Sequence, residues 1–280
     1  MVAAVLCLGR SAALAEAASG GKHCLWRITN APAPFYLLGS VHALSRSDYE
    51  RTPVIEGAIK QSAQIYFEFD PKEEPSFTKK LQEAAKYPPG EQIKDKISPK
   101  TYSYLMKITN QGWGEWQHLH PWAIAMLLNY PAMVGISGRY GIDNYVESKA
   151  RAYGKEMKGL ESADEHVRVF SDMYPSEGEV VLLEALIHAN DMPKRFHEQV
   201  AAWKRGDIDR IYATIAPEMK EAPTVQWRLL NRRNENWVPR IEAAIKSGKP
   251  TLIVAGAAHF AGPHSVLAML RAHGHKIEQL

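Results

Sequence analysis

The sequence has few cysteines, little net charge and no long apolar run, and each of these shortages excludes a class of protein. Only Cys7 and Cys24 occur among 280 residues. If the first 15 residues are removed, as argued below, a lone cysteine remains, so no internal disulfide can form and the fold depends on its hydrophobic core. No uninterrupted apolar stretch reaches the roughly 20 residues that a membrane-spanning helix needs. We therefore expect no transmembrane helix in the mature chain.

The charge balance excludes a second class. Lys and Arg number 34 against 31 Asp and Glu, a formal net charge of +3. This excess is small, and no basic stripe interleaved with aromatic residues occurs, so we expect no nucleic-acid partner. The chain is 45% hydrophobic and 23% charged, which is typical of a globular protein. No Gly/Ser linker, low-complexity run or tandem repeat divides it, and we expect a single domain over residues 16–280.

The N-terminus has the pattern of an export signal. Val2 to Leu8 form a short apolar core, and Ala13-Leu14-Ala15 offers a small-x-small cleavage pattern. We predict a signal peptide over residues 1–15 and a periplasmic or secreted mature protein. No Lys or Arg precedes the apolar core, which departs from the usual pattern, and the alternative is an Ala-rich terminal helix.

The periodicity along the mature chain alternates between strand and helix. "CLWRIT" and "FYLLGS" are predicted strands, a helix follows from about Pro53, and "QIYFEFD" is a third strand. Such a strand–helix–strand run is typical of a βαβ unit, so we expect the second and third of these strands to be parallel.

The remaining segments extend this pattern. Helical spacing of apolar residues over about 71–140 predicts a helical lobe inserted over the sheet. The same spacing predicts helix again from 164 to 206. Short strands are predicted at 157–160, at 252–254 and at the C-terminus. The predicted fold is α/β, with a mixed, largely parallel central sheet flanked by helices.

The same Gly-x-x-His motif follows two of the predicted strands. Gly39 precedes His42 by three residues after one strand, and Gly256 precedes His259 by three residues after another. Glycine lets a neighbouring group approach the backbone closely. Ligands in α/β sheets collect outside the carboxyl ends of parallel strands. We therefore predict that the two imidazoles converge on one site.

A third strand end adds carboxylates. Glu68 and Asp70 alternate along "IYFEFD", so we expect them on one face near its exit. Burying Glu68 between two phenylalanines is costly without a cation or a hydrogen-bond partner. Two imidazoles and a carboxylate suit zinc, manganese or cobalt, although no HExxH, Walker, GxSxG or GxGxxG motif occurs. We expect seven other histidines to be solvated: His118, His120, His166, His188, His197, His273 and His275.

One late helix is of special interest. Its predicted apolar face is formed by Leu229, Leu230, Trp237 and Ile241, and it also carries adjacent Arg233 and Asn234. Neighbouring helical residues point about 100° apart. We expect Arg233 to reach the carboxylates and Asn234 to bond backbone near a histidine-bearing strand.

In their order and spacing, several segments together resemble the TraB/GumN family: "FYLLGSVHAL", "IYFEFD", "HPWAIAMLL", "GIDNYVESKA", "GKEMKGLES", "LLNRRNENWVPRI" and "VAGAAHFAGPHSVLAML". That family includes bacterial pheromone-shutdown proteins, GumN-type proteins of exopolysaccharide gene clusters and animal Tiki proteases. Its two Gly-x-x-His motifs, strand glutamate and Arg-Asn pair match His42, His259, Glu68, Arg233 and Asn234. Glu161 in "GLES" and Asp143 in "GID" match recurrent acidic positions, and Phe260 stands where the family usually has leucine.

The resemblance implies a metal-dependent, peptidase-like hydrolase, distantly similar to erythromycin-esterase-like proteins and acting on a peptide or another small substrate. A divalent ion (Mn, Co or Zn) would be held by His42, Glu68 and His259. The catalytic candidates are Glu68, Glu161, Arg233 and Asn234, and the supporting candidates are Gly39, Gly256, Asp143 and Asp70.

Two other hypotheses stay open. In one, no metal binds and a histidine oriented by Glu68 or Glu161 is the general base of an esterase-like hydrolase. In the other, the chain is a non-catalytic protein that binds a peptide, a saccharide or a haem-like ligand and is linked to exopolysaccharide or peptide-signal processes.

Overall fold

A computed structural model describes residues 22–48, 52–109, 116–129 and 135–280, so the predicted signal peptide lies outside the described residues. Six strands form the main sheet in the order β6-β4-β7-β2-β1-β8. Their bounds are β1 Leu25–Ile28, β2 Phe35–Ser40, β4 Gln64–Phe69, β6 Glu156–Glu161, β7 Thr251–Gly256 and β8 Ile277–Gln279. Two further strands, β3 Leu44–Ser45 and β5 Ile136–Ser137, pair separately.

The predicted mixed, largely parallel sheet is confirmed. β2, β7, β4 and β6 are parallel, and β1 runs antiparallel to both β2 and β8. β2 and β4 share one direction, as the strand–helix–strand pattern predicts, but β7 lies between them. Every residue of β2 and of β7 is buried, as is typical of central parallel strands covered on both faces.

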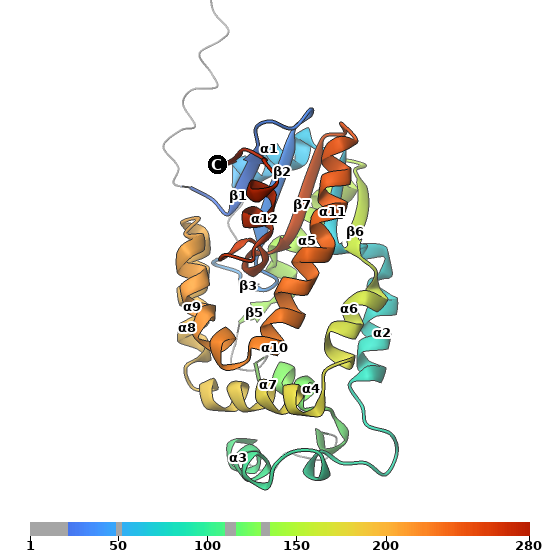
Figure 1. The fold of residues 1–280 in the computed structure, drawn as a ribbon, viewed down its shortest axis with the longest axis vertical. Helices are drawn as coiled ribbons and strands as arrows, with labels where there is room; N and C mark the ends of the chain where they lie inside the picture. The colour runs from blue at the N-terminus through green and yellow to red at the C-terminus, as the bar shows by residue number, and fades with distance from the viewer. Residues whose placement is uncertain (1–21, 49–51, 110–115, 130–134) are drawn as a thin grey trace, which may run out of the picture.

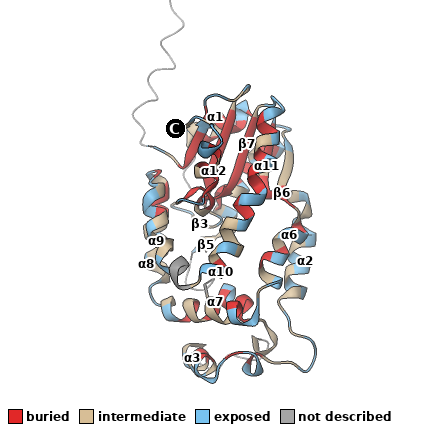
Figure 2. Ribbon diagram, viewed as in Figure 1, coloured by how far each residue is buried: buried red, intermediate tan, exposed pale blue. Residues whose placement is uncertain are grey.

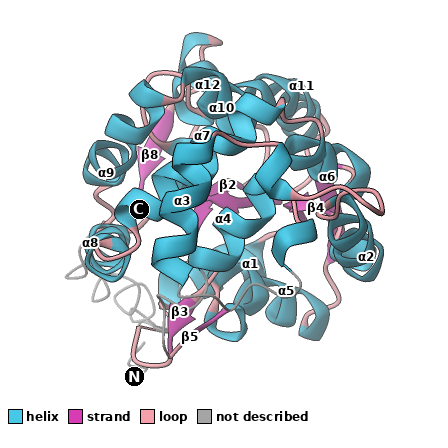
Figure 3. Ribbon diagram, turned by 90° about the horizontal axis from the view of Figure 1, so that it is seen from below, coloured by secondary structure: helices cyan, strands magenta, loops and turns pink. Residues whose placement is uncertain are grey.

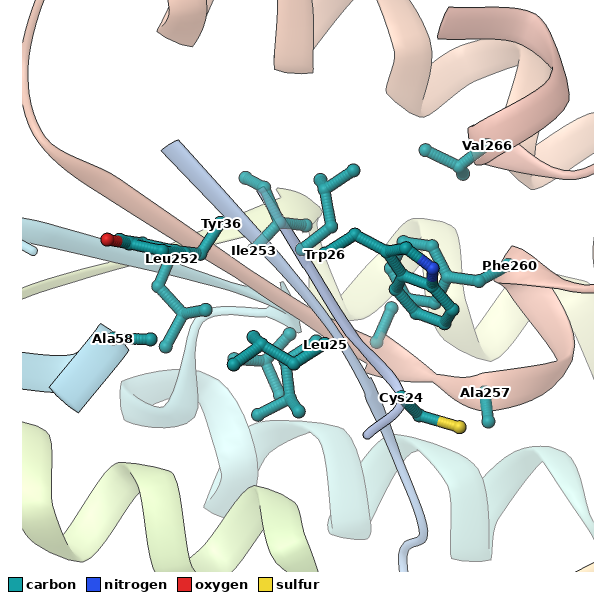
Figure 4. Packing of buried hydrophobic residues seen from close by; sticks show 14 of the residues in the cluster. Cys24, Leu25, Trp26, Tyr36, Ala58, Leu252, Ile253, Ala257, Phe260 and Val266 are labelled. Carbon is teal, nitrogen blue, oxygen red and sulfur yellow. The ribbon is translucent and has the colours of Figure 1, made fainter. Parts of the chain in front are cut away.

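Helices cover both faces of the sheet. In Figure 1, α11 (Arg232–Lys246) and α12 (Val266–Ala272) lie in front of the strands, and α1 (Pro53–Gln61) and α5 (Ile142–Ala152) lie behind them. Figure 2 shows that burial concentrates in the strands and in the helix faces turned toward them. Figure 4 shows Trp26 of β1 beside Phe260, with ring centroids 5.4 Å apart.

A helical layer lies at the carboxyl end of the sheet. Seen from below in Figure 3, α3, α4 and α7 lie across the ends of the strands. This part of the chain comprises α2 Glu74–Ala84, α3 Pro99–Thr109, α4 Pro121–Asn129, α6 Ala163–Ser171, α7 Pro175–His188, α8 Met192–Lys204, α9 Ile208–Glu221 and α10 Pro223–Gln226. The region 71–140, predicted as a helical lobe, supplies α2 to α4. A second apolar cluster is buried here, formed by Ile93, Ile97, Leu105, Ile124, Leu182 and Leu186; its last two members come from α7, so the layer extends beyond the predicted lobe.

Short segments complete the chain. The 3₁₀ turns are η1 Pro71–Glu73, η2 Ile93–Asp95, η3 Trp116–His118, η4 Gly138–Tyr140 and η6 Ala257–Phe260, and η5 (Trp227–Asn231) is a π-helix between α10 and α11. Among the helices of the described residues, none combines the length and apolar character needed to cross a membrane.

Candidate functional site

The two Gly-x-x-His strand ends lie side by side. β2 and β7 are adjacent and parallel, and Ser40 is in register with Gly256. The Nε2 atoms of His42 and His259 lie 3.7 and 4.0 Å from the same carboxylate oxygen, Oε1 of Glu68. Residues 217 positions apart in sequence thus meet at one edge of the sheet, as expected for the carboxyl ends of neighbouring parallel strands.

Glu68 turns into the gap where β4 and β7 separate. The pairing of these strands ends at Tyr66 and Ile253. Beyond that point Oε1 of Glu68 accepts a hydrogen bond from the backbone N–H of Gly256 at 2.9 Å. The side chain therefore satisfies a donor that the sheet ladder leaves unpaired. Only 10% of the Glu68 side chain is exposed.

The two glycines make close approaches. A Cβ atom on Gly256 would lie 3.1 Å from Nε2 of His42, and one on Gly39 would lie 3.1 Å from Cα of Ala257. Both contacts are tighter than ordinary van der Waals packing. A side chain at either position would displace its neighbour, so the glycines allow the close approach that the motif predicts.

The His42 ring is oriented by an acid from another element. Its Nδ1 lies 3.0 Å from Oδ2 of Asp143, in the first turn of α5, and Ser40 Oγ donates to Oδ1 of the same carboxylate at 2.8 Å. A carboxylate accepts, so Nδ1 of His42 carries the proton and Nε2 faces Glu68.

His259 is oriented by an amide. Its Nδ1 lies 2.6 Å from Oδ1 of Asn234, whose Nδ2 donates to the carbonyl of His264 at 2.9 Å. Because the amide nitrogen is engaged as a donor, its oxygen accepts from Nδ1 of His259. The Nε2 lone pair of this ring is therefore directed toward Glu68 and Arg233, whose Nη1 lies 3.2 Å away.

Arg233 connects the carboxylates. Its Nη2 donates to Oε2 of Glu68 at 2.5 Å and to Oε1 of Glu161 at 2.6 Å, and its Nε donates to both oxygens of Glu161 at 3.2 Å. Nε1 of Trp237 donates to Oε2 of Glu161 at 3.1 Å, and the Trp237 ring lies 4.6 Å from the guanidinium carbon. These buried groups form a hydrogen-bonded cluster in which one guanidinium is shared by two carboxylates.

Burial and the charge of Arg233 shift the pKa values of His259 and Glu68. Burial, followed by the Arg233 charge, lowers the pKa of His259 to about 3, so the ring is neutral. Burial acts to raise the pKa of Glu68, but Arg233 and then the histidines outweigh it and hold that pKa well below its usual range. Asp143 raises the pKa of His42, although this side chain is 65% exposed and solvent screens the attraction.

Two sequence predictions need correction. His166 of α6 is not a solvated surface residue, because its side chain is only 13% exposed and its Nδ1 lies 2.7 Å from Oε1 of Glu161. His275 is also mostly buried, with 18% of its side chain exposed and Nε2 3.7 Å from Glu242. Asp70 does not join Glu68; its Oδ1 accepts from the backbone N–H of Lys72 and caps η1. β4 ends at Phe69, so the strand alternation that placed Asp70 beside Glu68 no longer applies.

A cavity of about 590 Å³ opens over the cluster. His42, Glu68, Arg233 and His259 line its polar end. The rest of the lining is largely apolar and includes Phe69, Phe77, Leu81, Met126, Phe170 and Leu229. A substrate that binds here meets an apolar surface beside a charged cluster.

Within the described chain, one group of acidic and histidine side chains has all its candidate ligand atoms within 4.8 Å of one another: Glu68, Glu161 and His166. A buried Glu/Glu/His cluster of this kind suggests a metal ion. Nη2 of Arg233, however, lies between the two carboxylates at 2.5 and 2.6 Å and occupies the position that a cation would take.

Comparisons with known proteins agree with the resemblance found in the motifs. Metalloprotease TIKI2 of Danio rerio is 22% identical over 313 aligned residues, which cover 91% of this chain and 60% of the relative. Metalloprotease TIKI2 of Xenopus tropicalis is 21% identical, with 91% and 59% covered. The chain thus spans about 60% of the length of these curated relatives. No solved structure matches it significantly.

The family comparison covers far more than the motifs. The sequence pattern of the TraB/PrgY/gumN family matches residues 24–279, which include every strand of the main sheet and every residue of the site cluster. The chain therefore belongs to the TraB/PrgY/gumN family.

Proposed function

We propose that this protein is a metal-dependent hydrolase in which His42, Glu68 and His259 hold a divalent cation. One observation carries the proposal: two histidines present Nε2 toward the same oxygen of Glu68, at 3.7 and 4.0 Å. Donor atoms around a tetrahedral zinc ion lie about 3.3–3.5 Å apart, given bond lengths of about 2.0–2.2 Å. The two observed separations are a few tenths of an ångström longer, and the two Nε2 atoms are more than 4.8 Å apart. Binding a cation therefore requires the half-exposed His42 ring to move inward.

The groups behind the histidines support the same assignment. Metal-binding histidines usually donate their other ring N–H to a carboxylate or carbonyl, which fixes the tautomer. Asp143 supplies this contact to His42 and Asn234 supplies it to His259. A cation at His259 must compete with Nη1 of Arg233 for the Nε2 lone pair.

The alternative set of Glu68, Glu161 and His166 is less favourable. A cation between these carboxylates would have to displace the Arg233 guanidinium, which makes hydrogen bonds to both. We assign Glu161 and His166 instead to positioning Arg233, together with Trp237.

The residues then have distinct tasks. When bound, a divalent cation lowers the pKa of a coordinated water to about 7 and polarises a carbonyl. Arg233 lines the cavity and holds the Glu68 carboxylate in position beside the two histidines. Asn234 keeps the Nδ1 proton of His259 in place and acts through that ring.

The cavity supports a peptide as the substrate. Its aromatic wall suits an apolar side chain near the scissile bond, and Glu74, Asp143 and Glu147 line it as well. These carboxylates favour a neutral or cationic segment over an acidic one. The relatives named above are described as metalloproteases, which agrees with this choice. We also propose that residues 1–15 direct export, so that the substrate is met outside the cytoplasm.

A metal-independent hydrolase is the second candidate. The His42–Asp143 pair has the arrangement of a general base and its orienting acid, with Nε2 facing the cavity. Under this alternative, activity survives complete removal of metal.

Elemental analysis of protein purified without a histidine tag tests the proposal. We expect about one divalent ion per chain, and we expect His42→Ala and His259→Ala each to lose it. His273→Ala is the matched control, because that ring pairs with Glu242 at the surface, away from the cavity. Peptide hydrolysis should stop on chelation and return with the metal. Full occupancy in both site variants, or chelator-resistant hydrolysis, would reject the assignment.

A further inference from the structure

A second cavity lies beside the proposed catalytic cluster. It measures about 190 Å³ and is bordered by α6, η5 and α11. Among its lining residues are five arginines and three acids: Arg168, Arg228, Arg232, Arg233, Arg240, Glu161, Glu165 and Asp172. Arginines therefore exceed carboxylates by two in this small space.

Two of these five arginines, Arg228 and Arg233, also pair with carboxylates outside the lining, Glu177 and Glu68. Among the side chains that the structure describes in this lining, the positive charges left without an ion pair are those of Arg168 and Arg232. Glu161 is engaged by Arg233, and Glu165 by Arg240 at 3.1 Å. Within the described chain, Arg168 and Arg232 have no carboxylate within 4.0 Å, and both are exposed. Arg232 instead lies over the Trp227 ring, 5.6 Å from its centroid.

Arg228 adds a third guanidinium. Its Nη2 pairs with Oε2 of Glu177 at 3.1 Å, a buried ion pair with 11% and 9% of the side chains exposed. Its Nε is buried without a hydrogen-bond partner. Buried donors are nearly always paired, so Arg228 is held in place by its ion pair with Glu177 without all of its donors being satisfied.

We propose that this cavity binds a small anionic group, a phosphate or a carboxylate, between Arg168 and Arg232. Guanidinium groups present a planar fork of donors that matches both anions. The space is polar and open to solvent, so a hydrated anion can enter. The proposal does not depend on the hydrolytic reaction, because it concerns residues that do not line the larger cavity.

The cavity is nevertheless joined to the catalytic cluster through one residue. Arg233 lines both cavities. An anion beside it competes with Glu68 and Glu161 for the guanidinium and so alters the charge that the cluster presents to a substrate. The anion is therefore placed where it can modulate the reaction as well as bind.

Calorimetric titration of the full chain with inorganic phosphate, at constant ionic strength, tests the proposal. Saturable binding is expected for the wild type. Arg168→Gln/Arg232→Gln should weaken it about tenfold or more, since two charge-assisted contacts are lost. Arg27→Gln/Arg271→Gln removes the same charge from exposed arginines that do not line this cavity and should leave it unchanged. A parallel titration with acetate distinguishes phosphate from carboxylate recognition.

A variant that is expected to bind phosphate more tightly excludes misfolding as the cause of weaker binding. Asp172 lines the cavity, and among described side chains it accepts a hydrogen bond from Ser171 but forms no ion pair. Asp172→Asn removes an unfavourable charge and should tighten phosphate binding about twofold or more. Absence of saturable binding, or equal weakening in the site and control variants, would overturn the proposal.

Discussion

Replacing Arg233 with glutamine should destabilise the protein severely. The Arg233, Glu68 and Glu161 side chains are 10%, 10% and 7% exposed, and Nη2 contacts both carboxylates within 2.6 Å. Removing one partner of a buried ion pair leaves an uncompensated charge, at a cost of about 3–5 kcal/mol. Two carboxylates lose their partner here, so we expect at least the upper end of that range. This is a large part of the about 5–15 kcal/mol that stabilises a typical protein.

Companion variants separate charge from packing. Arg233→Lys keeps the charge but cannot hold Glu68 and Glu161 in the same bidentate arrangement, and we expect a loss of about 2 kcal/mol. Adding Glu161→Gln to Arg233→Gln removes one of the stranded charges and should recover stability relative to Arg233→Gln alone, which a double-mutant cycle reports as coupling.

Urea unfolding at pH 7 measures these differences, with Arg151→Gln as the control. Arg151 pairs with Glu147 on the surface of α5, with 53% and 27% of the side chains exposed, and such a pair contributes only about 0.3–0.5 kcal/mol. If Arg233→Gln loses no more than this control, or if Glu161→Gln adds its own cost without recovery, Arg233 does not stabilise the two buried carboxylates.

Three further predictions follow from other positions. Gly256→Ala places a methyl group against Nε2 of His42 and should weaken metal binding at least tenfold, whereas Gly57→Ala, where a Cβ meets nothing within 4 Å, should not; metal titration compares them. Burial acts to raise the pKa of Glu179, but hydrogen bonds from Thr101 and Ser98 lower it below its usual value. The carboxylate therefore stabilises the fold above its unfolded pKa of about 4.3, and this contribution is lost as pH falls through the folded pKa. Glu179→Gln should cost about 1 kcal/mol at pH 7, and urea unfolding should show this cost shrinking as the pH falls below that unfolded pKa. The intact mass of protein from its native host should correspond to a chain beginning near Glu16, and a full-length mass would contradict the predicted signal.

The sheet edge could be predicted because its determinants are local. An apolar strand, a glycine and a histidine three residues later occur twice, and parallel central strands deliver their ends to one side. The close contacts of Gly39 and Gly256 are the geometric reason for that spacing. The order of the strands could not be predicted from the sequence, because nothing in β2 or β4 indicates that β7 lies between them.

His166 could not be predicted for a physical reason. It lies on α6, whose pattern is that of an ordinary amphipathic helix, and the ring is drawn to the site by a carboxylate from β6 that only the tertiary fold brings near. A weak signal did exist: "GLESADEH" places the ring five residues after Glu161, across a Ser162 capping box that turns the chain from strand to helix. The prediction for Asp70 was wrong for a local reason. Its side chain accepts a hydrogen bond from the backbone N–H of Lys72, and such a local bond favours a turn over continued strand structure.

In the helix that carries Arg233, the 3.6-residue spacing of apolar residues does not predict correctly which side chains are buried. The sequence predicts one apolar face shared by Leu229, Leu230, Trp237 and Ile241, but Trp237 and Ile241 are in the core while the two leucines are only half-buried and line cavities. The π-helical turn η5 inserts a wider step between them, and a 3.6-residue pattern cannot register such a step.

That same turn explains how adjacent residues serve different partners. Nη1 of Arg233 donates to the carbonyl of Leu229, inside η5, while the rest of its guanidinium reaches Glu68 and Glu161. Asn234, about 100° further around α11, meets His259 and the His264 carbonyl. Both residues are buried, at 9% and 2% exposure, because this end of α11 has the carboxylates on one side and the segment after β7 on the other. A charged side chain and its polar neighbour can share a buried helix end only where each direction supplies its own partners.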